Sequence, residues 1–179
     1  MLKILSRITG SHRAEIKDAK RIYKKVMIQS RKTEFYGENL CADTTDGRME
    51  ILCLHLSTVM FVLRNHGENG AKLSQAIYDV MIDDFDIALR EEGLSDTGVA
   101  RRIKPLAKMF FTRAKQYADA FDEANANKNA LSDLIASRVC KTKGSTSKFV
   151  NYTGGFLSKL NRLSLGQLAL ADIDFPKLH

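Results

Sequence analysis

Apolar residues recur along this chain at the three- and four-residue spacings that are typical of amphipathic helices. The chain contains only 2 prolines, and since strands need frequent turn residues, this scarcity also favours helices. The pattern predicts helices over 13–32, 48–65, 71–92, 105–124, 129–140, 149–163 and 165–171, with a short helix before Pro105. We therefore expect an all-α fold, an irregular bundle of about five to seven helices in a single domain.

Punctuating residues mark where these helices begin and end. Segment 65–70 is predicted to be a loop, and Gly93 is placed to end the third helix. Pro105 is expected to divide the following segment, and Gly154 and Gly155 to interrupt the helical pattern near the C-terminus. Three residues could cap the second helix: Asp43, Thr44 and Asp46.

The helices differ in how their apolar residues are distributed. The helix over 48–65 is apolar nearly all round, which predicts a central position in the bundle. The first helix has an apolar arc beside an arc of lysines and arginines, so it either packs on the core or lies on a membrane or RNA. Four methionines could fill the core or line an adaptable apolar groove: Met27, Met49, Met60 and Met81.

The third helix carries most of the chain's clustered acids. Asp79, Asp83 and Asp86 form one stripe with Arg90. Asp84 and Glu91 instead fall on the apolar arc of that helix, where an unpaired carboxylate is costly. We therefore expect them to be paired, and four residues of neighbouring helices are candidate partners: Arg48, His55, Arg102 and Lys104.

Charge is spread unevenly over the chain, whose formal net charge is +7. The net charge is +7 over residues 1–36, −4 over 37–140 and +4 over 141–179. Basic ends either contact anionic surfaces such as rRNA or lipid headgroups, or are simply solvated. We assign 1–140 to a helical core, and 141–179 to a basic extension that packs on the same domain.

Known catalytic and metal-binding patterns do not fit this sequence. It has no Gly-x-Ser-x-Gly turn, no phosphate-binding glycine loop and no Glu-x-x-His pair for a di-iron site. Its 3 cysteines are far apart, which favours a reducing compartment over a disulfide framework. The longest apolar stretch, 51–63, is too short to cross a bilayer. We therefore expect a binding protein rather than an enzyme, with no cofactor and no metal.

Several blocks of residues, in order and at nearly gapless spacing, resemble the ubiquinol–cytochrome c chaperone family, whose mitochondrial members are Cbp3-type proteins. The resemblance extends from the first helix to about Phe121. The blocks comprise Gln29-x-Arg31, Phe35-Tyr36, Asp43-Thr44-x-Asp46-Gly47-Arg48, Glu50, Leu54-His55, Gln75, Tyr78-Asp79-x-Met81, Asp84-Phe85-Asp86, Leu89-Arg90-Glu91-x-Gly93, Asp96, Gly98-Val99, Arg102-x-Lys104 and Phe110-Phe111-x-Arg113. The chain departs from the family pattern at Asp83, Glu92, Pro105 and Thr112.

This resemblance implies a non-catalytic assembly chaperone that binds newly made cytochrome b of the bc1 complex. It also suggests contacts with a small partner protein and with the ribosome near its tunnel exit. The chain shows no long targeting extension, so we expect a bacterial cytoplasmic protein peripheral to the inner membrane, or a matrix protein in a eukaryote. The alternative is a helical ribosome- or RNA-associated protein without a cytochrome client. Twelve family-motif residues are the candidates for partner binding: Asp43, Asp46, Arg48, His55, Asp79, Asp84, Asp86, Arg90, Glu91, Asp96, Arg102 and Lys104.

Overall fold

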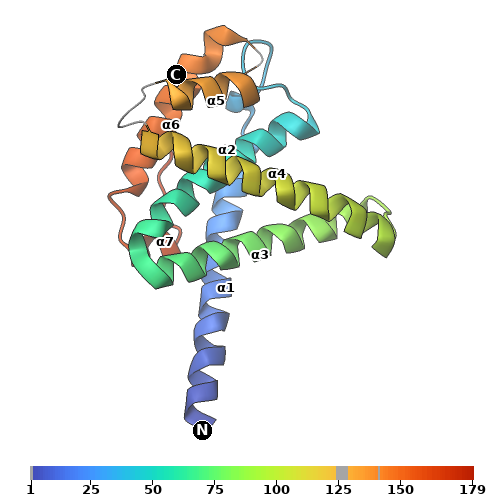
Figure 1. Ribbon diagram of the computed structural model, residues 1–179, viewed down its shortest axis with the longest axis vertical. Helices are drawn as coiled ribbons and strands as arrows, with labels where there is room; N and C mark the ends of the chain where they lie inside the picture. Colours follow the sequence, from blue (N-terminus) through green and yellow to red (C-terminus); the bar gives the residue numbers. More distant parts are fainter. Residues whose placement is uncertain (1, 124–128, 141) are drawn as a thin grey trace.

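The computed structural model describes residues 2–123, 129–140 and 142–179, with side chains from residue 14 onward except at 123 and 143. Over these ranges the chain is an all-α bundle without strands, as the periodicity predicted (Figure 1). Its α-helices and short 3₁₀ helices follow in order: α1 (Leu2–Ser30), η1 (Thr33–Phe35), α2 (Thr45–Leu63), η2 (Arg64–His66), α3 (Gly67–Glu91), α4 (Asp96–Glu123), α5 (Ala130–Arg138), η3 (Lys143–Ser145), α6 (Thr146–Leu160) and α7 (Leu165–Ala169). Two predicted boundaries, the helix end at 124 and the start of the extension at 141, lie outside the described residues.

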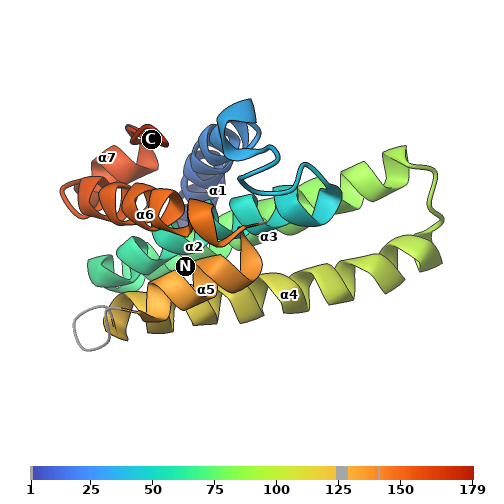
Figure 2. The same ribbon diagram turned by 90° about the horizontal axis from the view of Figure 1, so that it is seen from above.

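Helix α2 lies at the centre of the bundle and contacts α1, α3, α4 and α6. Every residue from Ile51 to Val59 is buried, which confirms the central position predicted from its apolar circumference. Helix α3 lies between α1 and α4, as Figure 2 shows from above. The N-terminal part of α1 extends away from the other helices (Figure 1).

Two apolar clusters on either side of α2 form the core. The larger one joins α1, α2 and α3 with residues of α4, α6 and α7, and includes Ile22, Val59 and Ile77. The smaller one joins the segment around Phe35 to α2, α4, α5 and α6. Helix α6 contributes to both clusters through fully buried aromatic rings such as Phe149 and Phe156, so the polypeptide beyond residue 141 is integral to the core.

The four methionines singled out in the sequence belong to this core. Met81 is fully buried, and Met27, Met49 and Met60 pack against the larger cluster. Of the two alternatives, these methionines therefore fill the core between helices rather than line an adaptable groove.

Three local predictions were wrong. Segment 65–70 is a tight corner rather than a loop: η2 leads directly into α3 at Gly67, whose φ of 61° is left-handed. Pro105 lies inside α4 without dividing it, on an exposed side of the helix. Gly154 and Gly155 continue α6, whose buried aromatic residues on either side hold the helical backbone.

Among the described residues, no helix has both the length and the apolar composition needed to cross a membrane.

Candidate functional site

Helices α3 and α4 form an antiparallel pair whose connected ends project to one side of the body (Figure 1). Gly93 ends α3 as predicted, in a left-handed conformation with φ of 87°. The Gly93 amide donates to the Arg90 carbonyl and the Leu94 amide to the Leu89 carbonyl, which is the Schellman pattern of a helix C-terminus. On the other side of the turn, the Ser95 hydroxyl accepts from the Gly98 amide and thereby caps the N-terminus of α4. The sequence therefore fixes where this helical pair turns.

A cavity of about 380 Å³ lies between the two helices near this turn. Its apolar lining comes from Ile82 on α3 and from Val99, Ala100 and Ile103 on α4. Its charged lining comes from five residues: Asp83, Asp86, Arg90, Asp96 and Lys104. Four of the twelve candidate residues, Asp86, Arg90, Asp96 and Lys104, are thus brought together around one apolar hollow.

Ion pairs hold the charged rim of this cavity in place. The Nε atom of Arg90 lies 2.5 Å from a carboxylate oxygen of Asp86, and Nη1 of the same guanidinium pairs with Asp96 across the turn. All three side chains are exposed by 38% or more, so their contribution to stability is small. Their effect is to fix the direction of the charges that a partner would meet.

A partly exposed aromatic pair continues this surface toward the body. The rings of Tyr78 on α3 and Phe111 on α4 lie with their centroids 4.7 Å apart and their planes tilted by 36°; Tyr78 is half-buried and Phe111 is 56% exposed. Ala100, Lys104 and Phe111 fall on one side of α4 at helical spacing, so the aromatic pair and the cavity share a face. We call this surface the α3–α4 face, and it comprises Tyr78, Asp79, Ile82, Asp83, Asp86, Arg90, Asp96, Lys104 and Phe111.

Sequence reasoning left Phe111 out of the candidate site although a signal was present. Two adjacent residues of a helix differ by about 100° in direction. Phe110 is buried in the core, and Phe111, turned by this angle, is exposed. A bulky aromatic residue that is exposed in this way is typical of a binding surface.

The expected pairing of Asp84 and Glu91 needs correction. Asp84 is half-buried, and its partner is the hydroxyl of Tyr23 on α1, which donates to it at 2.8 Å, rather than any of the four basic residues predicted. Burial and this carboxylate both raise the pKa of Tyr23. Glu91 is exposed, because α1 crosses the middle of α3 and leaves the end of the arc uncovered; Ile87 on that arc is 55% exposed.

His55 serves the core rather than the surface. It is completely buried, and burial lowers its pKa to about 4, so the ring is neutral near pH 7. Its Nδ1 lies 2.9 Å from the Ile51 carbonyl, which only accepts, and therefore carries the proton. Nε2 then accepts from the Tyr152 hydroxyl at 2.7 Å, and Gln29 donates to that hydroxyl at 3.0 Å. This chain of hydrogen bonds joins α1, α2 and α6.

The block Asp43-Thr44-x-Asp46-Gly47-Arg48 builds the start of α2. The Thr44 hydroxyl accepts from the Gly47 amide at 3.1 Å, so Thr44 is the cap among the three predicted candidates. Asp43 pairs with Arg48 at 2.6 Å. A side chain at Gly47 would lie 2.0 Å from the Ala42 carbonyl oxygen, which explains the glycine. Asp46 lines, together with Thr44 and Gly47, a cavity of about 270 Å³ that also contacts α5.

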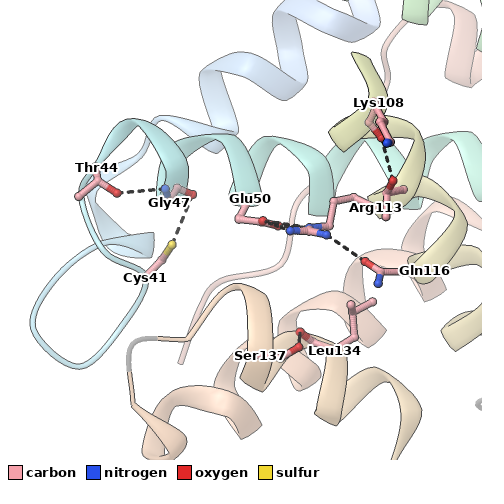
Figure 3. A network of polar contacts seen from close by, with 10 residues as sticks. Cys41, Thr44, Gly47, Glu50, Lys108, Arg113, Gln116, Leu134 and Ser137 are labelled. Atoms are coloured by element: carbon pink, nitrogen blue, oxygen red, sulfur yellow. Dashed lines mark hydrogen bonds and ion pairs between the residues drawn. The ribbon is translucent and has the colours of Figure 1, made fainter. Parts of the chain in front are cut away.

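A largely buried ion pair between two residues that are not among the twelve candidates connects α2 to α4 (Figure 3). Arg113 donates from Nε and Nη2 to the Glu50 carboxylate at 2.6–2.9 Å, and from Nη1 to Gln116 at 3.1 Å. The two charged side chains are only 11% and 12% exposed. Both belong to the family blocks, and their pairing sets the position of α4 on the central helix.

The remaining candidates lie on the surface. Asp79 accepts from Gln75 at 2.8 Å and is exposed on the α3–α4 face. Arg102 is exposed on α4, away from that face. Within the described part of the chain, no group of three or more His, Cys, Asp or Glu residues is placed to hold a metal ion.

These features define an all-helical protein whose projecting α3–α4 pair carries a cavity with an apolar lining and a charged rim. The family model described as ubiquinol-cytochrome C chaperone matches residues 41–175. Among solved structures, the Cbp3 homolog from Brucella abortus is similar, with 28% sequence identity, a TM-score of 0.77, and coverage of 99% of this chain and 97% of that chain. No curated protein sequence matches the chain significantly. This chain therefore belongs to the ubiquinol–cytochrome c chaperone family, and the match continues well beyond Phe121, where the resemblance in the motifs fades.

Proposed function

We propose that this protein is a non-catalytic chaperone that holds newly made cytochrome b during assembly of the ubiquinol–cytochrome c reductase (bc1) complex, and that the α3–α4 face is its client-binding surface. The observation that carries the proposal is the composition of that face. Family-motif residues from two helices meet there around an apolar floor, with an exposed aromatic ring beside it. Membership of a chaperone family supports a client polypeptide as the ligand.

The chemistry of a membrane-protein client fits this surface. Cytoplasmic loops of membrane proteins carry an excess of lysine and arginine, and apolar spans begin directly beside them. Asp79, Asp83 and Asp86 form an acidic stripe that complements such a loop. Ile82 and Phe111 offer apolar contact for the adjoining end of a span. The face thus offers both an acidic stripe for the basic loop and apolar contacts for the span beside it.

The family resemblance also suggests the setting. In this proposal the chaperone, together with a small partner protein, binds cytochrome b near the ribosomal tunnel exit while the client is being synthesised. The chaperone is then a cytoplasmic protein peripheral to the inner membrane in a bacterium, or a matrix protein in a eukaryote.

Capture of cytochrome b by tagged protein tests the client-binding surface. Phe111 exposes on the order of 100 Å², whose burial is worth roughly 2 kcal/mol. Phe111→Ser should therefore weaken capture of cytochrome b by about tenfold or more. Ile87→Ser is the matched control, because Ile87 is equally exposed but lies outside the face. Equal capture by the two variants would contradict the assignment of the surface.

The basic outer side of α1 favours a second candidate function, a ribosome- or RNA-associated protein without a cytochrome client. The two functions predict different phenotypes for a strain that lacks the protein. Loss of a cytochrome b chaperone lowers the haem b absorbance of the membranes and the amount of bc1 complex. Normal haem b spectra in a deletion strain would favour the second function.

A further inference from the structure

Helix α1 has two opposite faces, and only one of them packs on the core. Ala19, Ile22 and Val26 are fully buried against the core. The arc on the other side carries the exposed cations Lys17, Lys20, Lys24 and Lys25 and the half-buried Arg21, and Arg31 follows directly after the last residue of the helix. The apolar arc cannot lie on a membrane while it packs on α2 and α3, so any external role of α1 belongs to the cationic side.

An apolar residue stands in the middle of this cationic arc. Ile28 lies between Lys24 and Arg31 at helical spacing and is 58% exposed. Leu170, at the end of α7, is 67% exposed. The Arg21 guanidinium donates to the Ala169 carbonyl at 3.1 Å, so the end of α7 is fixed beside the cationic arc. Two of the most exposed large apolar side chains among the described residues therefore belong to one basic surface.

The acids near this surface leave most of its charge uncompensated. Asp18 pairs with Arg21 at 3.2 Å, and Asp174, which pairs with Lys159, also interacts electrostatically with Lys25. Lysines 17, 20 and 24 are exposed. A positively charged surface with isolated apolar side chains matches the headgroup region of an anionic bilayer, where cations meet phosphates and short apolar groups enter the acyl boundary.

We infer that the outer face of α1, together with Leu170, docks the protein on an anionic lipid surface through its lysines and through insertion of Ile28 and Leu170. RNA is the weaker match. Phosphate contacts alone leave exposed Ile28 and Leu170 without a partner, and single-stranded RNA is held by aromatic stacking, whereas Tyr23, the aromatic residue of α1, is buried. This surface would hold the protein at the membrane, which is the peripheral location proposed above, whether or not cytochrome b is the client.

Vesicle co-sedimentation of the full chain tests the inference. The protein should bind vesicles of phosphatidylcholine with phosphatidylglycerol, bind vesicles of phosphatidylcholine alone much more weakly, and dissociate as salt is raised. The double charge reversal Lys17→Glu with Lys24→Glu should weaken binding more than tenfold, since each cation near an anionic leaflet contributes about fivefold. Lys115→Glu, a single charge reversal at an exposed position of α4, should leave binding unchanged.

The apolar part of the surface separates lipid from RNA. Ile28→Ser with Leu170→Ser keeps every charge and should weaken vesicle binding by about tenfold, whereas Ile87→Ser should have no effect. Anisotropy with a labelled single-stranded RNA measures the alternative ligand. Vesicle binding that is indifferent to the apolar pair, or RNA binding through the lysines without vesicle binding, would overturn the inference. Either result would leave capture of cytochrome b at the α3–α4 face unaffected, so the two proposals fail separately.

Discussion

Removal of Arg113 should expose how strongly the α2–α4 contact depends on one ion pair. In Arg113→Ala the Glu50 carboxylate, which is only 12% exposed, loses all the donors that Arg113 supplies. A buried charge that loses its partner costs 3–5 kcal/mol, and the slight exposure of Glu50 places the expected loss near the lower end, at about 3 kcal/mol. For a chain of this length, that loss lowers the melting temperature by roughly 6–12 °C.

Urea denaturation followed by circular dichroism measures this loss, with an unchanged m-value indicating that the unfolded state is the same. Arg90→Ala is the matched control, because it also removes a guanidinium from a carboxylate pair but at an exposed site, where about 0.5 kcal/mol is expected. The companion variant Glu50→Gln with Arg113→Met removes both charges and should recover most of the lost stability. The reasoning is refuted if Arg113→Ala costs no more than Arg90→Ala.

The remaining predictions concern pH and two glycines. Because the pKa of His55 is depressed to about 4 in the folded state, the unfolded state binds the proton first as pH falls below 6.5. The free energy of unfolding should therefore drop by about 2 kcal/mol between pH 7 and pH 5. His55→Gln should be less stable at pH 7 but should lose most of this pH dependence, and an equally steep loss in that variant would contradict the assignment. Gly47→Ala should destabilise by several kcal/mol, because its methyl group would overlap the Ala42 carbonyl. Gly154→Ala, where the methyl group meets open space, should instead stabilise α6 by about 0.5–1 kcal/mol. Melting temperatures that move in the same direction for both glycine variants would refute the packing argument.

The sequence predicted features that depend on local pattern. The apolar circumference of α2 indicated its central position, Thr44 was among the predicted caps, and Gly93 ended α3. The predictions failed where distant packing decides. The periodicity at Pro105 and Gly154 gives no indication that flanking buried residues will keep α4 and α6 continuous.

The candidate site was predictable in part for the same reason. The motif blocks contained Asp86, Arg90, Asp96 and Lys104, but only the crossing of the helices shows that these residues surround one cavity. Asp84 and Glu91 share an arc in sequence, yet α1 covers one and not the other, because the contact between two crossed helices extends over only a few turns.

Photo-crosslinking in cells tests the central claim most directly. A photoreactive amino acid in place of Phe111, expressed in a bacterium that makes bc1 complex, should give an adduct with cytochrome b while the client is newly made. The same amino acid at the exposed Asn151 of α6 should give none. An adduct of equal yield from both positions, or no cytochrome b adduct from position 111, would contradict the claim that the α3–α4 face holds this client.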